Sequence, residues 1–134
     1  MQTLPRSFAD EMVAHALAED PNECCGIIAG IDGQAMKVYR ITNAERSPFR
    51  YNMEPRELFH AYRDLEDRGW TILAFYHSHT HSEAYPSATD VRLALANWPE
   101  PYYLLVSLMD RRHPVIRAFT IAPDGVAEEE LQIS

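Results

Sequence analysis

The sequence predicts one α/β domain, in which a mixed central β-sheet carries flanking helices. The chain has 134 residues, which is enough for one domain and too few for two. Amphipathic helical patterns alternate with short apolar runs that are typical of strands. The apolar share of 46% is ordinary for a globular protein, and no apolar run is long enough to cross a membrane as a helix. We therefore expect a single domain over residues 1–134.

Apolar residues spaced three and four apart predict a first helix over residues 5–19. The apolar face is made by Phe8, Met12, Val13, Ala16 and Leu17. His15 lies beside this face, so we expect it to be packed or half-exposed. The pair Asp20-Pro21 ends the helix, because a residue before proline disfavours helical geometry. Short strands are then expected over residues 25–29 and 35–41, joined as a hairpin by a turn at 31–33.

A second helix is predicted over residues 55–68. Pro55 suits a first helical position, and Gly69 suits the residue that follows the helix. The buried stripe of this helix is expected to consist of Leu58, Tyr62 and Leu65. Residues 70–76 are nearly all apolar, which indicates a central strand buried on both faces.

The last part of the chain predicts one more helix and three more strands. The helix runs from Ser87 to about Asn97 and is broken by Trp98-Pro-Glu-Pro101. Strands are expected over residues 102–109, 115–121 and 126–133, the last of them at an edge of the sheet. The loop 110–114 and the turn 123–125 join these strands, so His113 is expected to be a turn residue.

The densest group of polar side chains follows the central strand. His77 and His79 are two residues apart, so both side chains point to one face if the strand continues through them. Ser87 and Asp90 follow at the start of the third helix. Two neutral imidazoles and a carboxylate, with one position left for water, are typical of a catalytic zinc site. A simpler interpretation is also open, in which Ser87 and Asp90 form only a helix-capping box.

Other polar residues are expected to have a catalytic or binding role only if such a site is present. Glu23 stands just before the first strand and would be a surface acid on its own. A zinc hydrolase, however, needs a general base that does not bind the metal, and Glu23 can fill that role. The loop 42–52 contains Arg46 and Arg50, which either face solvent or hold a substrate carboxylate through paired hydrogen bonds.

Composition excludes several classes of function. The formal net charge of −8 argues against a nucleic-acid partner, which normally demands a basic surface. The N-terminal residues 1–6 lack the apolar core of a signal peptide, so we expect a cytoplasmic protein without a membrane anchor. Cys24 and Cys25 are adjacent, which excludes a disulfide framework and provides no C-x-x-C zinc site.

The spaced pattern resembles the JAMM metalloprotease motif of the MPN (Mov34/MPN/PAD-1) domain family. That motif has a glutamate on an early strand, then H-x-H, about seven residues, a serine, two residues and an aspartate. The matching residues here are Glu23, His77, His79, Ser87 and Asp90. The resemblance implies an MPN-type fold with zinc held by the two histidines and Asp90. It also implies Glu23 as the general base and Ser87 as a donor to the developing oxyanion.

Two longer segments resemble one branch of this family. They are Thr42-Asn-Ala-Glu-Arg-Ser-Pro48 and the stretch from His77 to Asp90. Small bacterial members of the branch release cysteine from the C-terminus of a ubiquitin-like sulfur-carrier protein during cysteine biosynthesis. The resemblance therefore implies a zinc-dependent hydrolase whose partner ends in Gly-Gly-Cys. Arg46 or Arg50 is then expected to bind the cysteine carboxylate or the carrier tail.

One position departs from the pattern of many family members. Thr80 follows the second histidine where proline is common, although threonine fits the sulfur-carrier branch. His81 adds a third imidazole, which we expect at the rim of the site, with metal ligation left open. Two alternative functions also stay open: a peptidase for another ubiquitin-like or small peptide substrate, and a metal-free MPN scaffold. Retention of all five motif residues argues against the scaffold. Homodimer formation through an edge strand is left open too.

Overall fold

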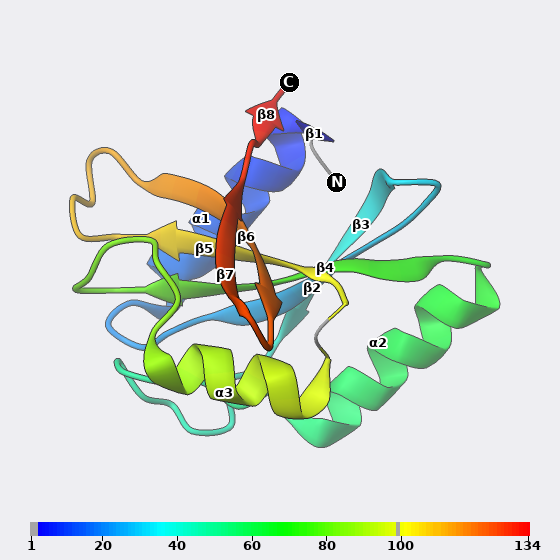
Figure 1. Ribbon diagram of the computed structural model, residues 1–134, viewed down its shortest axis with the longest axis horizontal. Coiled ribbons are helices and arrows are strands. Elements are labelled where there is room, and N and C mark those ends of the chain that lie inside the picture. Colours follow the sequence, from blue (N-terminus) through cyan, green and yellow to red (C-terminus); the bar gives the residue numbers. More distant parts are fainter. Residues whose placement is uncertain (1–2, 99) are drawn as a thin grey trace.

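The computed structural model describes residues 3–98 and 100–134, and its main feature is a six-stranded sheet (Figure 1). The strand order across the sheet is β3-β2-β4-β5-β6-β7. These strands are β2 (Cys25–Ile31), β3 (Gln34–Ile41), β4 (Thr71–His79), β5 (Tyr102–Ser107), β6 (Val115–Ala122) and β7 (Gly125–Glu129). The helices are α1 (Arg6–Glu19), α2 (Pro55–Asp67) and α3 (Ala88–Asn97). The predicted mixed α/β fold and the predicted order of elements from α1 to β7 are confirmed.

The central strand β4 has a different neighbour on each side. It pairs with β2 in antiparallel orientation and with β5 in parallel orientation, and α3 forms the crossover between β4 and β5. The remaining neighbours in this sheet are antiparallel. His77 is paired with Cys25 on one side and with Leu105 on the other. The end of β4 therefore lies in the middle of the sheet, between β2 and β5.

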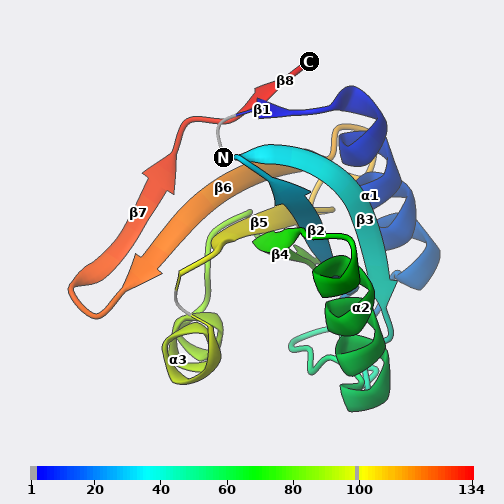
Figure 2. The same cartoon turned by 90° about the vertical axis from the view of Figure 1, so that its right-hand side faces the viewer.

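Helices cover the two faces of the sheet separately, with α1 on one face and α2 and α3 on the other (Figure 2). The α1 face contains a core that includes Met12, Ile28, Tyr76 and Leu104. The opposite face contains a second core that includes Ile27, Leu65, Phe75, Ala94 and Phe119. Successive side chains of β4 alternate between these cores, as the strand geometry requires.

The structure corrects three expectations, which concern the first helix, the second helix and the last strand. Leu17, expected on the buried face of α1, is 45% exposed, whereas Met12 and Ala16 are buried as predicted, together with Ala9 and His15. Tyr62, expected in the buried stripe of α2, is 36% exposed. The last edge strand is interrupted after Glu129, and a second short strand, β8 (Gln132–Ile133), follows. This strand pairs in parallel with β1 (Thr3–Leu4), which the sequence pattern does not indicate. A two-residue strand has no periodicity of its own and forms only where distant segments meet.

Other boundaries agree with the predictions within one or two residues. Pro55 begins α2, and Gly69 follows that helix with a φ of +75°, a conformation that favours glycine. Residue 99, within the predicted break after α3, and residues 1–2, within the N-terminal segment, lie outside the described residues. None of the described helices combines the length and the apolar character that a membrane span needs.

Candidate metal centre

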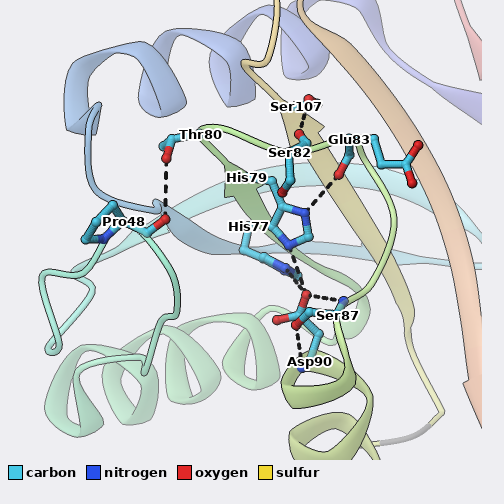
Figure 3. Close-up of polar contacts among 9 residues, drawn as sticks. All are labelled: Pro48, His77, His79, Thr80, Ser82, Glu83, Ser87, Asp90 and Ser107. Carbon is cyan, nitrogen blue, oxygen red and sulfur yellow. Dashed lines mark hydrogen bonds and ion pairs between the residues drawn. The ribbon is translucent and has the colours of Figure 1, made fainter.

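The end of β4 and the start of α3 bring three predicted ligands together (Figure 3). Since β4 continues through His79, both imidazoles point to the face that carries α2 and α3. The Nε2 atoms of His77 and His79 each lie 3.0 Å from Oδ2 of Asp90. One potential ligand atom from each residue lies within 4.8 Å of the other two. All three side chains are buried, so they form a compact set of donors shielded from solvent.

The hydrogen bonds of His79 show why this set fits a cation. Its Nδ1 atom lies 2.9 Å from the carbonyl oxygen of Glu83, which can only accept, so Nδ1 carries the hydrogen. In the neutral imidazole, Nε2 then has a bare lone pair facing a carboxylate oxygen of Asp90. Two such atoms repel each other unless a proton or a metal ion lies between them. The Glu83 carbonyl thus orients His79 as a metal-binding histidine is usually oriented.

The charge of Asp90 suits the role of a ligand. Burial raises the pKa of its carboxyl group, but the charge of His77 and hydrogen bonds from His77, His79 and the Ser87 backbone lower it far more. The net result is a pKa well below the usual range, so the carboxylate is ionised at neutral pH. For His79, burial lowers the imidazole pKa, whereas the hydrogen bonds with Asp90 and Glu83 raise it, and the net direction is upward.

Glu23 lies next to this group because of the pairing of β2 with β4. Cys25 pairs with His77, so an extension of that register by two residues places Glu23 opposite His79. The Glu23 side chain is only 3% exposed, and its Oε1 atom has no hydrogen-bond partner among the described residues. Burial raises the pKa of Glu23 to about 8, although His79 acts in the opposite direction. A buried, unpaired carboxyl beside two imidazoles is a strong candidate for a proton acceptor.

Asn43, which the sequence analysis did not identify, holds the backbone around Glu23. Its Nδ2 group donates to the carbonyl oxygens of Glu23 at 3.0 Å and Arg50 at 3.1 Å. Its Oδ1 atom accepts from the backbone N–H groups of Glu45 and Asn52, both at 3.0 Å. One buried amide therefore ties the loop 42–53 to the segment that carries Glu23. An asparagine after a strand is common in loops, so its residue type alone gave no signal.

Ser87 and Asp90 form the predicted capping box and belong to the candidate site at the same time. Ser87 Oγ accepts from the backbone N–H of Asp90 at 3.1 Å, and the Ser87 N–H donates to Oδ2 of Asp90 at 2.9 Å. Both interpretations of this segment are therefore compatible, because the carboxylate that caps α3 also faces the two histidines. The Ser87 residue is exposed, and its hydroxyl lies at the N-terminus of α3.

The two arginines and the third histidine lie outside this cluster. Arg46 and Arg50 are exposed, and Nε of Arg50 forms an ion pair of 2.9 Å with Oε2 of Glu45. His81 is exposed, and its Nδ1 atom lies 2.9 Å from the Thr80 hydroxyl. Among the described residues, the group that could hold a metal consists of His77, His79 and Asp90 and does not include His81.

Both cysteines are buried free thiols. Burial raises the pKa of Cys24 to about 12, and it also moves the pKa of Cys25 upward. The Cys25 thiol donates to the carbonyl oxygen of Ile41 at 3.4 Å. Protonated thiols in an apolar environment are poor metal ligands, so the two cysteines belong to the core rather than to the centre.

A cavity of about 350 Å³ lies beside the centre, and residues of α2, α3 and the loop before α2 line it. Aromatic side chains make much of its wall, including Tyr51, Phe75, Trp98 and Tyr103. The ring of Tyr51 also stacks on His77, with 4.5 Å between the ring centroids and 29° between the planes. Tyr51 therefore connects this cavity to the candidate ligand His77, although none of the three candidate ligands lines the cavity itself.

A buried pair of imidazoles and a carboxylate, with a free glutamate beside them, defines the type of centre found in metal-dependent hydrolases. The chain belongs to the family described as prokaryotic homologs of the JAB domain, which matches residues 5–122. It is a single JAB/MPN domain, and its fold agrees with this assignment.

Three curated relatives are peptidases. The chain is 41% identical to the CysO-cysteine peptidase of Mycobacterium tuberculosis, over 94% of this chain and 86% of the relative. It is 36% identical to a probable TtuB-protein conjugate cleaving protease of Thermus thermophilus, over 75% of this chain and 67% of the relative. It is 34% identical to a desampylase of Haloferax volcanii, over 78% of this chain and 79% of the relative. These likenesses support a peptidase or related hydrolase.

Solved structures show the same fold. A protein of Desulfitobacterium hafniense, determined in solution, superposes with a TM-score of 0.88 at 40% identity, covering all of this chain and 93% of that one. A JAB1/MPN domain protein from Archaeoglobus fulgidus superposes with a TM-score of 0.65 at 15% identity, covering 99% of this chain and 98% of that one. At that low identity, the second likeness concerns the fold alone.

Proposed function

We propose that this chain is a zinc-dependent peptidase that releases cysteine from the C-terminus of a ubiquitin-like sulfur-carrier protein in cysteine biosynthesis. The observation that carries the proposal is the convergence of His77, His79 and Asp90 beside the unpaired carboxyl of Glu23. The choice of substrate is supported by the 41% identity to a CysO-cysteine peptidase over most of both chains.

In this proposal, His77, His79 and Asp90 hold the metal. A zinc ion bound there would supply Lewis acidity, which lowers the pKa of water toward about 7. Glu23 accepts the proton of the attacking water as the oxygen forms a bond with the carbonyl carbon that precedes cysteine. Glu23 then delivers that proton to the leaving amine as the C–N bond breaks. The products are the carrier with a C-terminal carboxylate and free cysteine.

Two further roles complete the proposal. The Ser87 hydroxyl donates a hydrogen bond to the carbonyl oxygen as negative charge develops on it. Arg46 or Arg50 binds the cysteine carboxylate or the carrier tail, because an exposed guanidinium can hold a carboxylate with two hydrogen bonds. Alanine at both arginine positions is expected to raise KM several-fold and to leave kcat nearly constant, and an unchanged KM would exclude this role.

The decisive experiment is mass spectrometry of a carrier protein ending in Gly-Gly-Cys after incubation with this protein. Loss of one cysteine residue, blocked by a chelator and restored by zinc, is the expected result. The Glu23→Gln variant should keep bound zinc and lose turnover by a factor of about 10² to 10⁴. Glu130→Gln is the matched control, since Glu130 is exposed between β7 and β8 and should leave turnover unchanged.

Other outcomes separate the alternative functions. If the carrier stays intact while the protein binds one equivalent of zinc, the chain can still be a peptidase, but this substrate is rejected. Protein conjugates of other ubiquitin-like carriers would then be the next substrates, because the relatives include a desampylase and a probable TtuB-protein conjugate cleaving protease. An intact carrier together with absence of metal binding would favour a non-catalytic scaffold.

A further inference from the structure

The two histidines of the centre are held in different ways. The Nδ1 atom of His79 lies 2.9 Å from the Glu83 carbonyl oxygen, which fixes both the tautomer and the plane of that ring. The Nδ1 atom of His77 is buried and has no hydrogen-bond partner among the residues that the structure describes. A metal-binding histidine usually relies on such a partner, so another contact must fix the plane of His77.

The ring of Tyr51 provides that contact. Its centroid lies 4.5 Å from the centroid of the His77 ring, and the two planes are inclined by only 29°. This is a stacked arrangement, whereas His79 meets His77 edge to face, with 62° between the planes. Because a stacked neighbour resists rotation of the imidazole about χ2, Tyr51 limits the directions in which Nε2 of His77 can point.

The backbone around Tyr51 is itself fixed. Asn43 donates to the carbonyl oxygen of Arg50 and accepts from the N–H of Asn52, and these are the two residues that flank Tyr51. The backbone of Ala44 also donates to the carbonyl oxygen of Asn52 at 2.8 Å. The aromatic ring therefore extends from a clamped segment of the loop rather than from a free one.

We propose that Tyr51 is the positioning residue of His77, and that stacking replaces the hydrogen bond that His77 lacks. The inference rests on the proposed function, because it takes His77 to be a metal ligand. The ring acts through His77, on which it stacks directly. Since Tyr51 also lines the cavity between α2 and α3, an apolar group bound in that cavity touches the same residue.

The test compares zinc affinities of Tyr51→Phe, Tyr51→Leu and the unmodified protein, measured by competition with a chromophoric chelator. Tyr51→Phe keeps the ring, so its affinity should stay within about twofold. Tyr51→Leu removes the ring, so its affinity should fall roughly tenfold, the lower end of the range found when outer contacts of metal ligands are lost. The matched control is Tyr62→Leu on α2, whose side chain lies away from His77 and should leave the affinity unchanged.

Several results would overturn the inference. Wild-type affinity in Tyr51→Leu would show that the stack is dispensable, and equal losses in Tyr51→Phe and Tyr51→Leu would assign the effect to the hydroxyl. Circular dichroism checks folding, and Tyr51→Met, with the same expected tenfold loss, replaces the leucine variant if that one does not fold. Absence of zinc binding by the unmodified protein would instead reject the proposed function, so the two failures are distinguishable.

Discussion

Buried histidines lie on both faces of the sheet beside β4, in two different environments. On the α1 face, Nδ1 of His15 lies 2.7 Å from the hydroxyl of Tyr76, and His15 is only 4% exposed. On the other face, the next residue of the strand, His77, joins His79 around Asp90. Two neighbouring residues of β4 therefore contribute to two kinds of buried imidazole site.

The difference lies in what the partner can offer. The Tyr76 hydroxyl can both donate and accept, so it satisfies the neutral imidazole of His15 without any added charge. Burial lowers the pKa of His15 to about 4, and the nearby charge of Arg40 acts in the same direction. Asp90 can only accept, and it leaves a lone pair of neutral His79 unmatched. The donors and acceptors around a buried histidine, rather than burial itself, therefore distinguish a candidate metal ligand from a core residue.

The strongest test of this contrast is the Asp90→Asn substitution. An asparagine oxygen can still cap α3, but it lacks the charge that a metal ligand contributes. We expect loss of bound zinc and a fall in turnover of at least about a hundredfold. Metal content measured by atomic absorption, together with turnover, checks this result. If the Asp90→Asn variant still binds one equivalent of zinc, the charge of Asp90 does not distinguish the candidate metal site from the His15 site.

The second prediction concerns His15 and pH. Its folded-state pKa of about 4 lies below the ordinary value of 6.5, so the unfolded chain binds a proton more readily. The contribution of neutral His15 to the free energy of unfolding is therefore fully present above pH 6.5, and it is lost as the pH falls from 6.5 to 4. By pH 4.5 the loss attributable to this group should reach roughly 2–3 kcal/mol.

The variant His15→Gln isolates this contribution, because glutamine does not titrate and can still reach the Tyr76 hydroxyl. Urea unfolding at pH 7.5 and 4.5 should show a smaller pH-dependent loss for His15→Gln than for the unmodified protein. Zinc affinity should be the same in both at pH 7.5. Equal pH dependence in the two proteins would show that His15 is already protonated or exposed in the folded state.

The third prediction concerns Asn43, whose hydrogen bonds hold the backbone around the candidate site although Asn43 is not a candidate ligand. Asn43→Ala removes four hydrogen bonds and leaves buried backbone groups unpaired, so we expect a loss of about 2 kcal/mol in the free energy of unfolding. We also expect kcat/KM to fall, because Glu23 and Tyr51 both depend on this loop. The control is Asn52→Ala, whose side chain is exposed. Equal stabilities in the two variants would contradict the role of Asn43.

The smallest expected change in stability comes from Ser87→Ala. Loss of the helix cap should lower the free energy of unfolding by about 1 kcal/mol. The proposed hydrogen bond to the oxyanion also predicts a lower kcat at constant zinc content. Denaturant unfolding and steady-state kinetics measure the two effects separately. Unchanged kcat beside reduced stability would restrict Ser87 to capping.

Local patterns were sufficient to predict much of the fold and the three candidate ligands. The alternation of H-x-H along a strand and the spacing of a capping box are short-range features, and both appear in the structure. Glu23 followed only from the need of a zinc site for a general base and from the resemblance to the family, because its place opposite His79 depends on the register of two strands. Long-range contacts carry no such signal in a single sequence.

The same reason explains what the sequence did not indicate. Tyr51 reads as an ordinary loop residue until the fold places its ring on His77. The pairing of β1 with β8 joins residues separated by almost the whole chain. Leu17 fits the helical period of α1 but lies beyond the edge of the surface that the sheet covers, and only the packed structure shows where that edge is.

One carboxylate, that of Asp90, both caps the N-terminus of α3 and faces the two histidines. Any cation that binds there stabilises the folded state over the unfolded chain, and the gain grows with the logarithm of its concentration. If the proposed metal binds at this centre, its supply would govern how long each molecule survives proteolysis as well as how fast it works. A cell short of the metal would lose protein as well as activity, and the abundance of this chain would follow the availability of the ion.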